Sequence, residues 1–326
     1  MMGRFGPAPD RESMAPSTIL DLRQASVRQI EPLLEEETRR WRDELHWDYR
    51  NAAELIRRFV EARSLGGFVA MENGQAVGYS FYVLEDLKGL IGGLYVMAPY
   101  LERDTGPRLL DELLFNLRAV PRLQRIESQL MPFGSSMDAA LAAHGFRLYP
   151  RQFLSLSLTG GFPPKEESEP SSLLERWNDR FMEPCAQLIR LAYADHVDSQ
   201  INDQYQTAAG ALRFLKNIIL LPGCGQFLPG ASFFARSPGG YDLLGAVLSS
   251  EVAPRVGHIT QLCVRPGLQG QGLGRRLTLA AIGALRETKF SELTLTVTSA
   301  NAPAVRLYEK LGFRTVKTFS AGVWPA

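Results

Sequence analysis

Two distant stretches of this 326-residue chain resemble each other, and this likeness limits the folds that the chain can adopt. "LYVMAPYLERDTGPRLL" begins at Leu94 and "LCVRPGLQGQGLGRRLT" begins at Leu262, and five of their aligned residues are identical at a separation of 168. "HGFR" at 144–147 and "LGFR" at 311–314 repeat at a separation of 167, as do the glycines of "AVGYSF" and "LLGAVL". A nearly constant separation indicates a duplicated domain rather than a solenoid of short repeats.

The boundaries of the two copies follow from composition. Residues 159–172 include "TGGFPPKEESEP", which has almost no apolar surface to bury, so we interpret them as a linker. We interpret residues 1–17 as a disordered tail, and they lack the apolar stretch of a signal peptide. The sequence therefore predicts one domain over 18–158 and a second over 173–326.

The overall composition fits a globular protein, with 45% hydrophobic and 22% charged residues. A net charge of +1 gives no broad basic surface for nucleic acid. The three scattered cysteines, Cys185, Cys224 and Cys263, argue against disulfides and against a metal cluster. No apolar run approaches the roughly 20 residues that a membrane span needs. We expect a cytoplasmic protein, a monomer or homodimer, without a nucleic-acid or membrane partner.

Hydrophobic periodicity predicts an α/β (α+β) arrangement in the second copy. Helices are expected at 180–196 and 206–219 and, after three strands, at 273–287, where apolar residues recur every fourth position. The predicted strands are "SFFARS", "DLLGAVLSSE", "GHITQLCV", "LTLTVT" and "FRTVKTFS", with the turn "PGG" between the first two. Asn301 is expected to cap a short helix that ends at Gly312. The sequence therefore predicts a sheet covered by helices.

Three alternate glycines, Gly270, Gly272 and Gly274, stand between a predicted strand and the predicted helix at 273–287. Backbone amides at a helix start are unpaired and partly positive, so a loop without side chains can bind a phosphate there. The residues after Gly274 are arginines, which excludes a P-loop, and the spacing does not fit a dinucleotide fingerprint. We expect the loop to bind a pyrophosphate; the alternative is a glycine-rich loop without a ligand.

Two motifs carry a family resemblance. "QGQGLG", Gln269 to Gly274, resembles the Q/R-x-x-G-x-G/A acetyl-CoA signature of the GNAT superfamily of N-acyltransferases, and "NAPAVRLYEKLGF", 301–313, resembles its second motif. The likeness covers roughly residues 175–320. The duplicated layout is similar to that of mycothiol synthase-like double-GNAT proteins. The resemblance implies two tandem GNAT-like domains, each with a mixed, mostly antiparallel central sheet flanked by helices, and a degenerate N-terminal copy.

This resemblance also implies where acetyl-CoA, the cosubstrate, would bind. The acyl-CoA would lie between the strands "ITQLCV" and "LTLTVT", with its pantetheine arm on the backbone of Cys263 and Val264. Asn301 matches the family's asparagine that bonds this arm; its alternative role is that of a helix cap. The pyrophosphate would lie on the amides of Gln269, Gly270, Gln271, Gly272, Leu273, Gly274 and Arg275. Arg275 or Arg276 would add positive charge beside the pyrophosphate. The alternative for each is a position on a solvated helix face.

Tyr308 and His258 are the predicted catalytic residues. Tyr308 stands where the family's tyrosine protonates the leaving thiolate; otherwise it is a core tyrosine of a helix. His258 opens the central strand and is a candidate base, although a histidine at a strand edge is an equally good interpretation. Glu251 is a weaker candidate. Cys263 lacks a histidine partner, so we interpret it as a small buried residue.

The remaining expectations concern the acceptor and the first copy. The segment 193–205 concentrates polar groups that suit an acceptor: His196, Asp198, Asn202, Asp203 and Tyr205.

The first copy departs from the motifs, because Leu101, Asp104, Gly134 and Leu141 replace Gln269, Gly272, Asn301 and Tyr308. We therefore expect this copy not to bind CoA, since Asp104 would repel a pyrophosphate, and to form part of the acceptor wall.

The sequence thus predicts an N-acetyltransferase active in its C-terminal domain only. It would move the acetyl group of acetyl-CoA to a primary amine of a small molecule or peptide, by direct attack in a ternary complex. Two alternatives stay open at this point. One is a non-catalytic acyl-CoA-binding or interaction protein, and the other is an acyltransferase for a non-amine acceptor or a longer acyl group.

Overall fold

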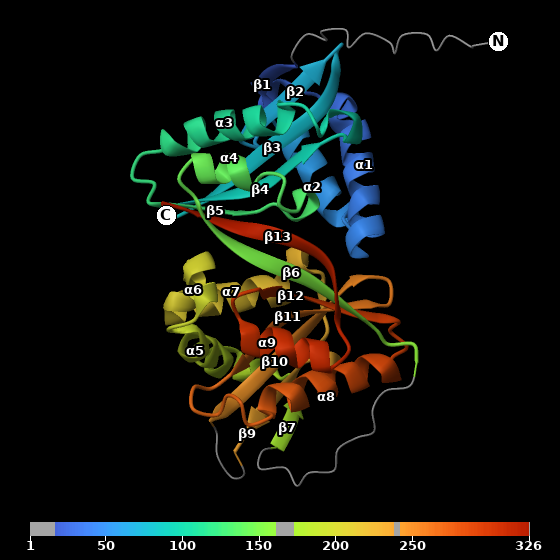
Figure 1. Ribbon diagram of the computed structural model, residues 1–326, viewed down its shortest axis with the longest axis vertical. Coiled ribbons are helices and arrows are strands. Elements are labelled where there is room, and N and C mark those ends of the chain that lie inside the picture. Colours follow the sequence, from blue (N-terminus) through green and yellow to red (C-terminus); the bar gives the residue numbers. More distant parts are fainter. Residues whose placement is uncertain (1–16, 161–172, 238–241, 326) are drawn as a thin grey trace, which may run out of the picture.

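The computed structural model describes residues 17–160, 173–237 and 242–325 (Figure 1). Most of the expected tail and linker, and the expected turn at 238–240, lie outside these residues. The division into two domains at 159–172 therefore stays a prediction.

The first half of the chain alternates strands with helices. Its elements are β1 (Thr18–Asp21), α1 (Val27–Leu45), α2 (Arg50–Glu61), β2 (Gly67–Glu72), β3 (Gln75–Glu85), β4 (Lys88–Val96), α3 (Thr105–Arg118), β5 (Arg125–Gln129), α4 (Asp138–Ala143) and β6 (Arg147–Ser157).

The second half repeats this order with a few additions. Its elements are β7 (Leu173–Arg176), α5 (Met182–Tyr193), α6 (Val197–Ile201), α7 (Ala208–Leu220), β8 (Gln226–Phe227), β9 (Phe233–Arg236), β10 (Leu243–Ala253), β11 (Val256–Val264), α8 (Leu273–Glu287), β12 (Glu292–Thr298), α9 (Ala302–Lys310) and β13 (Arg314–Trp324). The central strands β4 and β11 begin 168 residues apart (88 and 256), and the final strands β6 and β13 begin 167 apart (147 and 314). The predicted tandem α/β architecture is confirmed.

One continuous sheet runs through both halves, in the order β1-β2-β3-β4-β5-β13-β6-β12-β11-β10-β9-β7, with β8 beside β10. Its neighbours are antiparallel except for β4 with β5 and β11 with β12, which are parallel. The halves exchange their last strands. β6 of the first half lies between β13 and β12, and β13 of the second half lies between β5 and β6.

The two exchanged strands pair with each other at the centre of the molecule. Arg147 faces Val323 and Leu154 faces Thr315 in an antiparallel ladder. Because β6 and β13 are equivalent strands of the two copies, this pairing relates the halves by an approximate two-fold axis. Figure 1 shows β6 in green and β13 in red crossing between the halves. The exchange carries first-half side chains onto the second half's sheet.

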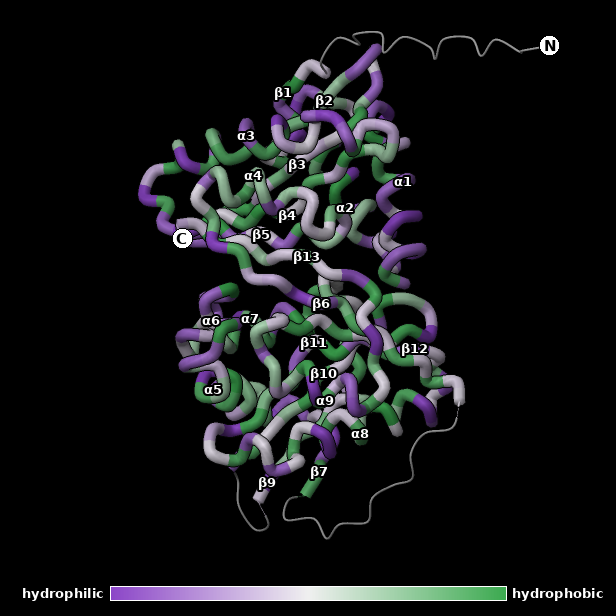
Figure 2. Tube along the Cα trace, viewed as in Figure 1, coloured by the Kyte–Doolittle hydropathy of each residue, from purple (hydrophilic) through white to green (hydrophobic). Residues whose placement is uncertain are grey.

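Helices cover both faces of the sheet in each half. In the second half, α8 packs its fully buried Leu277, Ala281 and Leu285 against Leu293 and other β-strand residues. On the opposite face, α5 and α7 pack against β10. Figure 2 shows mostly hydrophilic residues along α1 and hydrophobic ones along α3 and α5. No helix in the described part of the chain has the length and apolar character to cross a membrane.

Candidate active site

A gap opens between the two parallel strands of the second half. The ladder of β11 with β12 ends at the pair Ile259–Leu295. Beyond it, β11 stays paired with β10 as far as Val264, and β12 stays paired with β6 as far as Thr298. The strands therefore diverge, and the edge of β11 that carries Cys263 and Val264 faces the opening.

The glycine-rich loop between β11 and α8 closes the outer end of this gap. Gly267, Gly270 and Gly272 have φ angles of +83°, +77° and +84°, which residues with side chains rarely adopt. A Cβ on any of the three would meet nothing within 4 Å, so the backbone conformation, not packing, requires glycine. Gly274 differs, because its φ is ordinary and a Cβ would make normal contact with Leu307, 3.6 Å away.

The amides of this loop are available for an anion. None of the backbone N–H groups of residues 269–274 donates to a backbone carbonyl of a described residue, and Gly272 is the N-cap of α8. The two glutamines brace the loop instead: Gln269 Nε2 donates to Val264 O at 3.2 Å, and Gln271 Nε2 donates to Gly267 O at 3.0 Å. Unpaired amides at the positive end of a helix favour a phosphate group.

Tyr308 lies in α9, in the core cluster that contacts β12. Its side chain is buried and packs edge-on against Phe313 with ring centroids 5.6 Å apart. Its hydroxyl makes no hydrogen bond to any residue that the structure describes. Burial raises the pKa of this phenol well above its usual value, and the negative charge of Asp198 adds to the shift. Tyr308 therefore keeps its proton at neutral pH.

Asn301 and Cys263 have structural roles in the free protein. Asn301 Oδ1 caps α9 by accepting a hydrogen bond from Ala304 N at 3.2 Å, which leaves its Nδ2 group for a ligand. Burial raises the pKa of the Cys263 thiol to about 12, so the side chain is not a thiolate. This agrees with its interpretation as a small buried residue.

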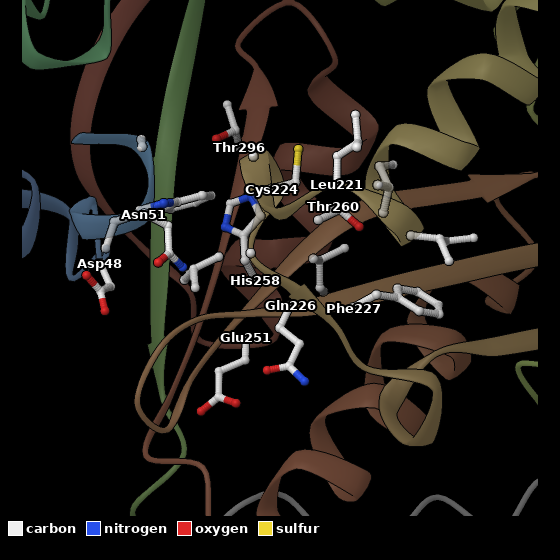
Figure 3. Close-up of a pocket in the computed structure, with 18 of the residues that line it drawn as sticks. Asp48, Asn51, Leu221, Cys224, Gln226, Phe227, Glu251, His258, Thr260 and Thr296 are labelled. Carbon is white, nitrogen blue, oxygen red and sulfur yellow. The ribbon is translucent and has the colours of Figure 1, made fainter. Parts of the chain in front are cut away.

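A cavity of about 1170 Å³ lies on the other side of the gap, and both halves line it. The first half contributes Trp41, Trp47, Tyr49, Asn51 and, from the exchanged strand, Arg151. The second half contributes residues that include Asp198, Tyr205, Cys224, Glu251, His258, Thr260 and Thr296. Figure 3 shows His258 near Thr260 on the β11 wall, with Glu251 and Gln226 together at one end. The first half thus forms part of the cavity wall.

His258 is neutral in this cavity. Its Nδ1 lies 2.8 Å from Thr294 Oγ1, and that hydroxyl donates to Gly257 O at 3.1 Å. The threonine oxygen must then accept from the imidazole, so Nδ1 carries the hydrogen and Nε2 keeps its lone pair. Burial, together with the positive charge of Arg151, lowers the pKa of His258 to about 3. The ring is suited to accepting a hydrogen bond and poorly suited to holding a proton.

Thr294, Thr296 and Thr298 of β12 lie on the face of the sheet that carries the cavity. The residues that alternate with them face the core against α8; these are Leu293, Leu295 and Val297. Thr296 lines the cavity, and the Thr298 hydroxyl donates to Asp198. Asp198 therefore lies at the open end of the gap.

The structure divides the polar segment 193–205 between two tasks. Asp198, Asn202 and Tyr205 line the cavity. His196 instead caps α6, and Asp203 forms an ion pair of 2.6 Å with Lys88 of the first half.

The sequence did not single out Tyr193, although it lies within this segment. Its hydroxyl donates to Leu262 O on β11 at 3.2 Å, and its ring stacks on Tyr205 with centroids 4.4 Å apart. An aromatic residue at the end of a helix carries no signal in one sequence that distinguishes this role from core packing.

The matching loop of the first half has a different structure. This loop after β4 forms a short 3-10 helix, Ala98–Tyr100, and Glu36 accepts the Ala98 amide at 2.8 Å. A Cβ on Gly106 would lie 3.4 Å from Met137 Sδ and 3.9 Å from Phe133, which is ordinary contact, as at the equivalent Gly274. Leu141, at the position that matches Tyr308, is buried in the core.

Comparisons with known proteins agree with this geometry. The model of the acetyltransferase (GNAT) family matches residues 205–313. Mycothiol acetyltransferase of Saccharomonospora viridis is 46% identical over 63 residues, and that of Acidothermus cellulolyticus is 48% identical over 59. These matches span 19% and 18% of this chain, and 21% and 18% of the relatives, about a fifth of their length.

Solved structures extend the likeness to the whole fold. A GCN5-related N-acetyltransferase from Sphaerobacter thermophilus has a TM-score of 0.64 at 16% identity, covering 83% of this chain and 84% of that one. A tandem GNAT protein from the clavulanic acid biosynthesis pathway has a TM-score of 0.53 at 17% identity, and the match covers 79% of this chain and 82% of that chain.

Proposed function

The chain has the tandem GNAT fold with an acetyltransferase (GNAT) family domain in its second half, and from this premise we propose that it transfers the acetyl group of acetyl-CoA to a primary amine. One observation carries the proposal. The gap between β11 and β12 has open loop amides at its outer end and a large cavity on its inner side. That arrangement suits a long cosubstrate that enters from one side and an acceptor that enters from the other.

In this proposal the second half binds acetyl-CoA. The diphosphate lies on the amides of residues 269–275, because these amides converge at the N-terminus of α8. The pantetheine arm pairs with the free edge of β11 at Cys263 and Val264 as an added strand would. The Asn301 amide nitrogen, which the helix cap does not use, bonds the same arm. The first half has Leu101, Asp104, Gly134 and Leu141 at the positions of Gln269, Gly272, Asn301 and Tyr308, so we expect it not to bind CoA.

The chemistry is then a direct transfer. The neutral amine nitrogen attacks the thioester carbonyl carbon, an N–C bond forms, and the C–S bond of the tetrahedral intermediate breaks. The Tyr308 hydroxyl, which burial keeps protonated, gives its proton to the leaving thiolate. His258 is the predicted base; its low pKa makes it a hydrogen-bond acceptor at Nε2 rather than a carrier of the proton, which water removes.

A turnover assay tests this function. Purified protein is mixed with acetyl-CoA and a panel of amines, and CoA release and acetylated products are measured, with acetyl-CoA binding measured separately by calorimetry. Amine-dependent CoA release supports the proposal. Acetyl-CoA binding without turnover of any amine would favour a non-catalytic acyl-CoA-binding protein, and no binding at all would reject both.

A further inference from the structure

The cavity contains one strongly basic side chain among the described residues that line it, Arg151. We propose that this guanidinium binds a carboxylate of the acceptor, and that the acceptor is an amino acid with a large apolar side chain. The inference rests on the proposed function, because it names the class of amine that the same site acetylates.

Arg151 is placed for this task by the strand exchange. It lies on β6, the first half's final strand, directly opposite Thr298 at the end of β12. Its Nη1 donates to Gln129 Oε1 at 2.6 Å, which fixes the plane of the guanidinium. No described carboxylate forms an ion pair with it, and its buried Nε has no hydrogen-bond partner. A buried cationic donor without a partner is unfavourable and calls for a ligand.

The unused edge of Arg151 has the geometry of a carboxylate site. Since Gln129 occupies Nη1, the Nε and Nη2 donors are left, and these two form the parallel pair that bonds both oxygens of a carboxylate. Arg151 and His258 both line the cavity, and the positive charge of Arg151 lowers the pKa of His258. An anion bound at this edge would satisfy the Nε donor and neutralise the guanidinium.

The amine and the carboxylate of the acceptor would lie close together. Arg151 is the direct neighbour of Thr298, so the two backbones are about 5 Å apart. The Thr298 hydroxyl bonds Asp198, whose carboxylate is the nearby partner for an amino group. A positive and a negative side chain therefore flank one place at the open end of the gap. We infer from these neighbouring positions an acceptor with its amine and carboxylate on the same or an adjacent carbon.

The other carboxylates that line the cavity do not oppose an anion at Arg151. Asp48 is bound through both oxygens by Arg50, with bonds of 2.5 to 3.1 Å. Glu251 accepts the Arg255 amide at 3.0 Å and pairs in register with Gln226 of β8, at another part of the wall.

The rest of the cavity suits an apolar side chain. Its wall along α7 and the following segment is formed by Ile218, Leu220, Leu221 and Phe227, and Leu55 of α2 contributes from the first half. Leu220 and Leu221 are 69% and 54% exposed, so an apolar group bound there would remove apolar surface from water. The cavity of about 1170 Å³ exceeds what the amine and carboxylate alone require. A large apolar side chain would cover this wall.

Matched amines test the inference. Acetylation of L-phenylalanine and L-leucine is compared with that of phenethylamine and isoamylamine, which lack only the carboxylate, and with phenylalaninamide, which keeps the shape without the charge. Phosphoethanolamine tests whether a phosphate replaces the carboxylate. We expect kcat/KM to be roughly 10- to 100-fold higher for the amino acids, the range for hydrogen bonds to a charged group. Equal rates with and without the carboxylate would reject the inference and leave the acetyltransferase proposal intact.

Variants assign the preference to one side chain. Arg151→Gln should remove the preference for a carboxylate while acetyl-CoA binding stays unchanged, and Arg147→Gln, at an exposed arginine of the same strand, is the control. Gln129→Glu is a second test. It places a carboxylate on Nη1, which neutralises Arg151 without shortening its side chain and should also remove the preference for a carboxylate. A preference that persists in both folded variants would contradict the assignment.

A binding measurement separates this inference from the function. If no amine is acetylated, the proposed function fails, and calorimetry with L-phenylalanine against phenethylamine still tests Arg151. Binding that needs the carboxylate and is lost in Arg151→Gln supports the inference. Equal binding of the two ligands, or of neither, overturns it.

Discussion

Burial decides what the Tyr308 hydroxyl can do. Because its pKa is raised and it makes no hydrogen bond to a described residue, it can give a proton to a thiolate in the gap. Tyr308→Phe should lower kcat by roughly 100-fold or more, within the range for general acid catalysis, with little change in the Kd for acetyl-CoA. Tyr149→Phe, which loses only a bond to Gln200, is the control. A kcat within twofold of wild type in Tyr308→Phe would exclude the acid role.

His258 should not titrate in the pH range in which acetyl transfer is assayed. A pKa of about 3 keeps the folded-state imidazole neutral above pH 5. We expect the profile of kcat/KM between pH 6 and 8 to keep its shape in His258→Gln, even if its height changes. A wild-type inflection near pH 6.5 that disappears in this variant would show that His258 is a titrating base and would contradict the low pKa.

Glu37 should make stability depend on pH in the opposite sense to most carboxylates. It is buried in α1, where Tyr79 donates to it at 2.5 Å, and burial raises its pKa from 4.5 to about 7. A raised pKa stabilises the fold below pH 4.5, and this contribution is lost as the pH rises through 7. The loss is roughly 3 kcal/mol.

Urea unfolding across this range measures the effect of Glu37. The free energy of unfolding of Glu37→Gln, relative to wild type, should rise between pH 4.5 and 8. Glu35→Gln, at an exposed position of the same helix, is the control for replacing a glutamate there. A Glu37→Gln profile parallel to that of wild type would show that Glu37 ionises normally.

At the scale of elements, the loop between β11 and α8 depends on glycine for its backbone. Gly272→Ala should cost about 1–2 kcal/mol of stability, since its φ is +84°. A loop that relaxes this strain moves its amides, so the Kd for acetyl-CoA should rise by about tenfold, or 1.4 kcal/mol. Gly283→Ala, in α8 with ordinary φ and open space around it, should be stabilising and leave binding unchanged. Equal affinities in both variants would rule out the loop as the diphosphate site.

Sequence periodicity predicted the elements of the second half well, because each depends on local signals. The expected helix at 273–287 matches α8, and Gly312 has the expected left-handed φ of +92°. The glycine loop was also predictable, although Gly267 was missed because it lies outside the motif. The cavity could not be predicted, because its wall joins Trp47 and Arg151 to residues far away in the sequence.

At the scale of the whole molecule, the exchange of β6 and β13 had no signal in the sequence. Each strand has the same apolar pattern whether it pairs within its own half or in the other half. Pairing is decided by long-range register, such as Leu293 of β12 opposite Leu156 of β6. The exchange gives a physical reason for keeping a first half that lacks the CoA motifs, because that half supplies a strand of the second half's sheet and Arg151 of its cavity.

The exchanged strands should hold the halves together even when the chain between them is cut. A specific protease site placed within residues 161–172 allows the purified protein to be cleaved into two fragments. Separating them would expose both edges of β6, which lies between β12 and β13, and would remove β13 from its place beside β5. We therefore expect the cut protein to elute from gel filtration as a single species at the uncut volume. Its unfolding midpoint should become concentration-dependent, since refolding then joins two chains. Two separate peaks, each with native circular dichroism, would show instead that the halves fold independently and that the central strand pairing contributes little.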